Sequence, residues 1–138
     1  EKIVFVRQYR HAIQQTTLEL PGGVIDSNEN PETAAIREVQ EETGYQITNI
    51  QLLYKTAPNP ATNTNFAYFY LAKASSKITT QQFDEFEDIE VVCFTKAEVL
   101  NMIHSSQLSH GVQIGAIYAA FEQLGWFKMI WCFNTTAC

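Results

Sequence analysis

The chain has 138 residues, 46% of them hydrophobic and 17% charged, which is enough for one domain with a core and too few for two. Its net charge of −6 argues against sequence-independent nucleic-acid binding but allows a small anionic substrate, because a bound metal or a few arginines can reverse the sign of a pocket. No apolar run is long enough to span a membrane and no Cys-x-x-Cys pair occurs, so we expect a cytoplasmic protein without a zinc site or disulfides.

The N-terminal part of the chain predicts two strands followed by a strong break. Residues 3–9 are rich in β-branched and aromatic side chains and predict a strand. The sequence opens at this strand without a Met, so we expect earlier residues to exist. Residues 17–20 predict a short strand that ends at Pro21-Gly22-Gly23. A proline followed by two glycines suits a backbone that bends sharply or approaches a ligand closely.

Residues 31–43 carry both start and stop signals of a helix. Asn30 is a good N-cap, Pro31 fits the first helical position, and Gly44 suits the left-handed position after the last turn. Glu32 lies where the helix dipole favours an anion. The apolar side that can pack on a sheet is formed by Ala35, Ile36, Val39 and Thr43.

The second half of the chain alternates predicted strands and helices. Strands are expected at 47–55, at 66–72 and at 89–94, and the second is expected to be central because it is apolar on both faces. A polar loop at 59–65 and an acidic loop at 84–88 separate them. Thr95 and Glu98 form a capping box for a helix to about residue 103, and residues 113–124 predict a last helix that Gly125 ends. The aromatic tail 126–138 stays unassigned, and helices on a mixed sheet indicate the α/β or α+β class.

Three glutamates share one face of the predicted helix 31–43. Glu38, Glu41 and Glu42 stand at i, i+3 and i+4, where each like-charge pair costs roughly 0.2–0.5 kcal/mol. Arg37 offsets part of this repulsion by pairing with Glu41, and a hard divalent ion such as Mg²⁺ or Mn²⁺ would offset more. A solvated acidic surface is the plain alternative. The preceding glycine break and the acidic loop favour a metal site.

The residues around this helix resemble the Nudix box in full register. Tyr45 is the one departure, because an aliphatic residue is usual at that position and aromatic ones are tolerated. A signature of this length is rarely met by chance. The matching positions, in their order along the chain, are Gly23, Glu29, Arg37, Glu38, Val39, Glu41, Glu42 and Gly44.

The resemblance extends on both sides of the box toward the ADP-ribose pyrophosphatase branch of the family. Segments 7–10 and 19–23 look like that branch. The branch is also marked by a proline fifteen residues after the box, and Pro60 stands fifteen residues after Tyr45. The acidic segment 84–91 is similar as well. Coverage is about residues 3–124. The fold that this implies is one Nudix-type domain over 1–138, an α/β/α sandwich with a mixed central sheet.

The resemblance also implies a set of metal ligands. Enzymes of this family use Mg²⁺ or Mn²⁺, and the direct ligands here would be Glu38, Glu42 and the backbone carbonyl of Gly22. Glu41 would be a further ligand or a close support. Arg37 would orient the glutamates.

The remaining roles concern the substrate and the attacking water. The catalytic base is expected from the acidic loop, at Glu87 or, as second choice, Glu85. Arg10 is expected to meet a substrate phosphate, with Pro60 in the substrate-binding loop. The plain alternatives are a solvated Glu87, an Arg10 that forms only a salt bridge, and a structural role for Glu19. The three histidines lack metal-ligand spacing and are expected at the surface or at helix caps.

The leading expectation is an enzyme, a homodimer that hydrolyses ADP-ribose to AMP and ribose 5-phosphate. A second reading keeps the chemistry and changes the substrate to another nucleotide sugar or a dinucleotide. A third reading is a non-catalytic domain that senses a nucleotide metabolite. Three mutually repelling glutamates with Arg37 argue against it, because a sensor need not keep them. A structural interaction module is the weakest reading.

Overall fold

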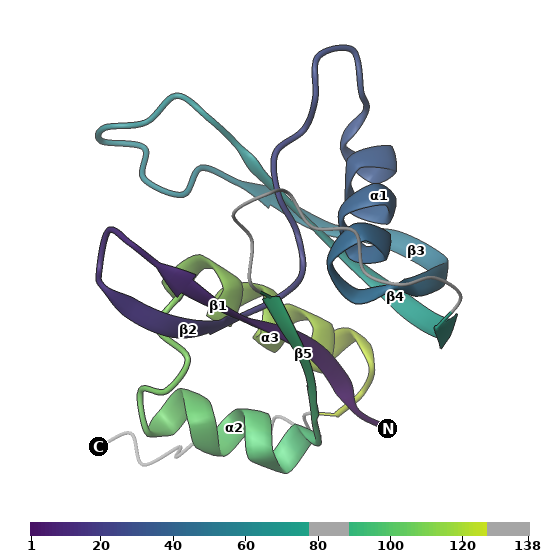
Figure 1. Ribbon diagram of the computed structural model, residues 1–138, viewed down its shortest axis with the longest axis vertical. Coiled ribbons are helices and arrows are strands. Elements are labelled where there is room, and N and C mark those ends of the chain that lie inside the picture. The colour runs from purple at the N-terminus through teal and green to yellow at the C-terminus, as the bar shows by residue number, and fades with distance from the viewer. Residues whose placement is uncertain (78–88, 127–138) are drawn as a thin grey trace, which may run out of the picture.

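The structure, a computed structural model, describes residues 1–77 and 89–126 (Figure 1). All the helices and strands predicted from the sequence are present, with ends that shift by a few residues. In chain order the elements are β1 (Ile3–Arg10), β2 (Gln15–Glu19), α1 (Pro31–Thr43), β3 (Tyr45–Thr56), β4 (Ala67–Lys77), β5 (Ile89–Phe94), α2 (Lys96–His104) and α3 (Gly111–Gln123).

The strands form two antiparallel sheets. One has the order β2-β1-β5, so β1 is its centre, with Val6 opposite both Glu19 and Val91. The other contains β3 and β4. The α+β class is confirmed, and within the described residues every strand pair is antiparallel. The prediction of a central strand at 66–72 is wrong for this part of the chain, because β4 pairs there with β3 alone.

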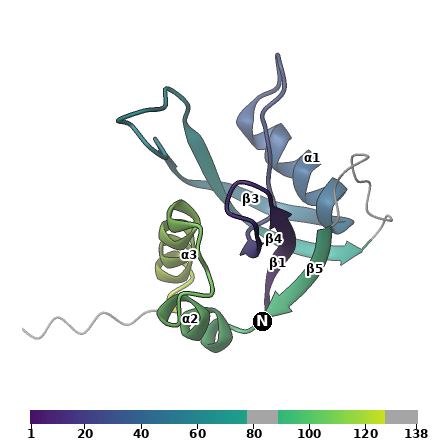
Figure 2. The same cartoon turned by 60° about the vertical axis from the view of Figure 1, so that its left-hand side comes forward.

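Helices cover the strands from two sides, as expected for an α/β/α sandwich. Figure 2 shows α1 on one side of the strands and α2 and α3 on the other. Helix α1 contacts β3 and β4, while α3 contacts β3, where the Tyr54 hydroxyl donates to the Val112 carbonyl at 3.3 Å. The β3–β4 sheet is therefore contacted by α1 and by α3. No described helix has the length and hydropathy needed to cross a bilayer.

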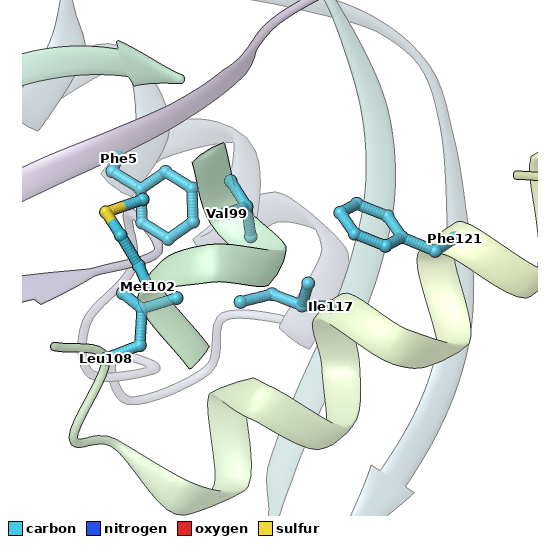
Figure 3. Packing of buried hydrophobic residues seen from close by; sticks show 6 residues of the cluster. All are labelled: Phe5, Val99, Met102, Leu108, Ile117 and Phe121. Carbon is cyan, nitrogen blue, oxygen red and sulfur yellow. The ribbon is translucent and has the colours of Figure 1, made fainter. Parts of the chain in front are cut away.

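The main core lies between β1 and the two C-terminal helices (Figure 3). It joins side chains from β1, from α2, from the segment after α2 and from α3, and it therefore fixes the three-stranded sheet against α2 and α3. Because β2 pairs with β1, this core also sets where the chain leaves β2 on its way to α1. The buried members are Phe5, Val99, Met102, Leu108, Ile117 and Phe121.

The helix ends follow the capping signals where these exist. The Asn30 side chain accepts from the Thr33 N–H at 2.9 Å, and Gly44 has a φ of 70°, so the predicted bounds of α1 are confirmed. Both bonds of the Thr95–Glu98 capping box at α2 are present. Helix α3 begins two residues before the predicted start. Its N-cap, His110, makes no capping hydrogen bond through its side chain, so the sequence held no signal for that end.

Candidate active site

The chain between β2 and α1 brings two glutamates of the helix to one glycine pair. The Gly22 N–H donates to Glu42 Oε2 at 2.9 Å, and Glu42 is only 7% exposed. At Gly23 a Cβ would lie 2.5 Å from the Glu38 carboxylate, so a residue with a side chain would push that carboxylate away. Glu38 and Glu42 therefore share one face and meet the glycine pair, as their i,i+4 spacing predicts.

Arg37 holds the acidic side chains around the helix in place. The predicted pair with Glu41 is present, with Nη1 3.0 Å from Oε2. The same nitrogen lies 2.9 Å from Glu38 Oε1. On the other side, the guanidinium binds both oxygens of Glu29 at 3.1 and 3.0 Å and donates to the Val24 carbonyl. The hydrogen bonds with Glu29 raise the pKa of Arg37, and those from Arg37 lower the pKa of Glu29.

Helix α1 buries part of the face that carries its glutamates. Ala34 is buried and stands on the same stripe as Glu38 and Glu42, at spacings of four residues. Thr43 is buried as expected. Ile36 was expected on the packed side but is 38% exposed, whereas Ala34 and Glu42, which were not expected there, are buried. The burial of Glu42 is offset by the hydrogen bond from Gly22.

A second charged group lies on the β1–β2 hairpin. The guanidinium of Arg10 binds both oxygens of Glu19, at 2.8 and 2.7 Å, and the Thr17 hydroxyl donates to the same carboxylate at 2.6 Å. Glu19 is 4% exposed. The hydrogen bonds from Arg10 lower the pKa of Glu19 more than its burial raises it. Arg10, 45% exposed, thus forms a salt bridge with a buried carboxylate, and this pairing leaves its predicted role toward a substrate phosphate a prediction.

The site lies within a stretch that matches a known protein family. The family model, described as the NUDIX domain, matches residues 1–110 of this chain. The chain belongs to the NUDIX domain family. Among curated proteins, this NUDIX domain is 30% identical over 108 residues to an ADP-ribose pyrophosphatase of Bacillus subtilis (strain 168). It is 32% identical over 108 residues to a methanol dehydrogenase activator of Bacillus methanolicus. It is 35% identical over 99 residues to a GDP-mannose pyrophosphatase of Yersinia enterocolitica.

The NUDIX domain spans only part of these relatives. The two Bacillus matches cover 78% of this chain and 58% of the relative, and the Yersinia match covers 70% and 51%. Among solved structures, the crystal structure of an ADP compounds hydrolase superposes with a TM-score of 0.73 at 21% identity. That match covers 89% of this chain and 66% of the other, and it confirms the fold.

The oxygen atoms predicted to hold an ion in this NUDIX domain are of a type that suits a hard divalent cation. Carboxylates and a backbone carbonyl are the donors that Mg²⁺ and Mn²⁺ prefer, and two carboxylates meet the same glycine pair. Over residues 1–77 and 89–126, no three His, Cys, Asp or Glu side chains are gathered so that they could hold an ion as they stand. Arg37 engages Glu38 and Glu41, and the Gly22 N–H engages Glu42, so ion binding would require these side chains to turn.

The remaining predicted site residues are a loop proline and two glutamates of the acidic loop. Pro60 is exposed in the loop between β3 and β4. Glu85 and Glu87 fall outside the described residues. The histidines are exposed, with His110 at the N-cap of α3, so the surface and cap reading is confirmed. The pairing of Glu29 with Arg37 was not predicted from the sequence. The only hint was that Glu29 is one of the positions that match the Nudix box.

Proposed function

We propose that this NUDIX domain catalyses metal-dependent hydrolysis of the diphosphate bond in a nucleoside diphosphate linked to another moiety. ADP-ribose, cleaved to AMP and ribose 5-phosphate, is the proposed substrate. The observation that carries the proposal is the meeting of the Glu38 and Glu42 carboxylates at the Gly22–Gly23 pair. Relatives named as pyrophosphatases for ADP-ribose and GDP-mannose support it. A homodimer in the cytoplasm is part of the same proposal.

The metal-holding residues would be the carboxylates of α1 and the glycine bend. Glu38, Glu42 and the Gly22 carbonyl would bind Mg²⁺ or Mn²⁺, with Glu41 as a further ligand or support. When bound, such an ion neutralises phosphate charge and lowers the pKa of a water molecule. Arg37 keeps the glutamates in orientation through its five-donor guanidinium, which lysine could not reproduce.

The substrate and water roles complete the proposed chemistry. The Arg10 side chain is partly exposed and is held in one position by Glu19. It would therefore bind a phosphate oxygen without losing further conformational freedom. Glu87, with Glu85 as second choice, would accept the proton of the attacking water. Pro60 would contribute to the substrate-binding loop.

Two further candidates each follow from one similar protein. Hydrolysis of another nucleotide sugar is favoured by the GDP-mannose pyrophosphatase at 35% identity. A regulatory role, which would suit a non-catalytic domain that senses a nucleotide metabolite, is suggested by the relative named as a methanol dehydrogenase activator. A catalytic role is favoured over both regulatory and sensing roles by the set of Arg37, Glu38, Glu41 and Glu42. Like charges on one helix face lower the stability of the helix, and a domain that only binds a metabolite has no need to keep them.

A substrate panel tests the proposal. The protein is incubated with ADP-ribose, GDP-mannose, NADH and ATP, each with Mg²⁺, with Mn²⁺ or with excess EDTA, and the products are separated by chromatography. We expect release of AMP from ADP-ribose in the presence of metal and none with EDTA. Preferential release of GMP would select the second candidate. Pyrophosphate from ATP as the main product, or no product with any compound, would contradict the proposal.

A further inference from the structure

The glycine bend before α1 is held from two different layers of the fold. The Leu20 N–H donates to Gln113 Oε1 at 2.7 Å, and the Gly22 N–H donates to Glu42 Oε2 at 2.9 Å. Pro21, between them, has no N–H to donate. Both backbone donors that flank the proline are therefore bound by side chains, one from α3 and the other from α1.

Gln113 is well placed to act as a fixed acceptor. It stands in the first turn of α3, and its half-buried side chain is next to Ile114, which packs against the main core. The same turn is fixed to β3, since the Tyr54 hydroxyl donates to the Val112 carbonyl. A side chain on so well-packed a turn loses little further freedom when it binds the bend, so the hydrogen bond holds Leu20 at a defined place.

The strand that leads into the bend is fixed as well. Glu19, immediately before Leu20, is buried and held by Arg10 and Thr17. Side chains from β1, β2, α3 and α1 thus hold the chain at Glu19, Leu20 and Gly22 in succession. The hydrogen bond from Leu20 to Gln113 joins the backbone of the bend to α3, while the Leu20 side chain packs against the main core.

We infer that Gln113 is a positioning residue that, by fixing the glycine bend, sets the position of the Gly22 backbone relative to the Glu42 carboxylate. This inference rests on the proposed function, since it concerns how the proposed metal site is held. Gln113 lies beyond residues 1–110, the part of the chain that the family model matches, and it contacts the bend across 93 positions of sequence. It would act through the backbone of the bend without touching the ion or the substrate.

Three variants isolate the acceptor on Gln113. Gln113→Leu removes it at similar size, Gln113→Glu keeps an oxygen acceptor, and Gln123→Leu is a matched control at the exposed end of α3. Three quantities are measured for each: amide hydrogen exchange at Leu20 and Gly22 by NMR, Mn²⁺ binding by calorimetry, and kcat and KM for ADP-ribose. A thermal melt verifies that each variant is folded.

For Gln113→Leu we expect about tenfold faster exchange at Leu20, faster exchange at Gly22, and Mn²⁺ binding weakened by about three- to tenfold. The kcat should fall while KM changes little. Gln113→Glu should keep most of the protection, and Gln123→Leu should match the wild type.

The inference is overturned if Gln113→Leu leaves exchange and Mn²⁺ binding unchanged, or if Gln113→Glu loses as much as Gln113→Leu. A wild type that binds Mn²⁺ but hydrolyses nothing would defeat the proposed function alone. In that case the exchange and Mn²⁺ measurements still decide the role of Gln113.

Discussion

At the glycine bend, a single missing Cβ lets a carboxylate approach the backbone closely. A Cβ at Gly23 would lie 2.5 Å from the Glu38 carboxylate, so the second glycine of the pair lets that carboxylate keep its present place. Glycine is favoured at position 22 for a different reason, because the φ of 155° there is one that residues with a side chain rarely adopt. The two glycines thus serve two physical needs at consecutive positions.

Glu19 gives a prediction about pH. Its folded-state pKa is lowered below the ordinary value of 4.5, mainly by Arg10, with smaller effects of Thr17 and His110. A lowered pKa contributes stability that is present above about pH 4.5 and is lost as the pH falls through the folded-state value. Glu19→Gln should therefore lower the free energy of unfolding by about 1–3 kcal/mol at pH 7, and this difference should shrink below about pH 4.5.

Urea unfolding of the wild type and Glu19→Gln between pH 7 and pH 3 measures this difference. Glu90→Gln is the control, because its partner is also an arginine, Arg7, but both side chains are exposed. Its effect should stay below about 1 kcal/mol. A Glu19→Gln difference that stayed constant down to pH 3 would show that charge on Glu19 does not matter.

Individual residues of the site differed in how far sequence could predict them. The pair between Arg37 and Glu41 follows from i,i+4 spacing, because a helix makes such side chains neighbours. The shared face of Glu38 and Glu42 follows for the same reason. Gln113 could not be predicted, since its bond to Leu20 depends on how α3 packs beside β2, and no local pattern encodes that.

At the scale of elements, Gly125 gives a prediction about how α3 ends. Its φ is 67°, and the Trp126 N–H then donates to the Phe121 carbonyl at 2.8 Å, which places the two rings 5.2 Å apart. Gly125→Ala should destabilise the fold by about 1–2 kcal/mol, because a Cβ opposes the left-handed conformation. Open space surrounds that position, so backbone strain is the only cause.

Gly111→Ala is the matched control, since open space also surrounds Gly111 but its φ is not in the left-handed region. At the start of α3 an alanine should be neutral or stabilise by about 0.4–1 kcal/mol. Thermal unfolding measures both variants. Equal effects at the two glycines would contradict the role assigned to the conformation of Gly125.

The elements that sequence predicted best are those with signals at both ends. Helix α1 has Asn30 and Pro31 at its start and Gly44 at its end, and its bounds agree with the prediction. The start of α3 was misplaced because His110 contributes no side-chain hydrogen bond to the cap. Strand β4 was recognised by its apolar residues, but the same residues suggested a central strand.

At the scale of the whole molecule, the layers place the site where two parts of the fold meet. The segment between β2 and α1 crosses from the three-stranded sheet to the helix that covers β3 and β4 (Figure 1). Its glycine bend is therefore held by α3 on one side and by α1 on the other. The sandwich was expected from the resemblance, but the division into two antiparallel sheets was not, because pairing between distant strands leaves no local signal.

The central claim is that the glutamates of α1 and the glycine bend bind a divalent ion that hydrolysis requires. Calorimetric titration of Mn²⁺ into the wild type and Glu42→Gln, with and without ADP-ribose, tests it most directly. Glutamine can still accept from the Gly22 N–H, so Glu42→Gln removes charge while keeping the bend. Glu122→Gln, an exposed change on α3, is the control.

We expect the wild type and Glu122→Gln to bind Mn²⁺ alike. Glu42→Gln should bind it at least about tenfold more weakly, and its kcat should fall by more than the roughly 10–100-fold that outer-shell changes cause. Its thermal midpoint should stay near that of the wild type. Equal Mn²⁺ binding by Glu42→Gln and the wild type, or no binding by the wild type with ADP-ribose present, would contradict the account.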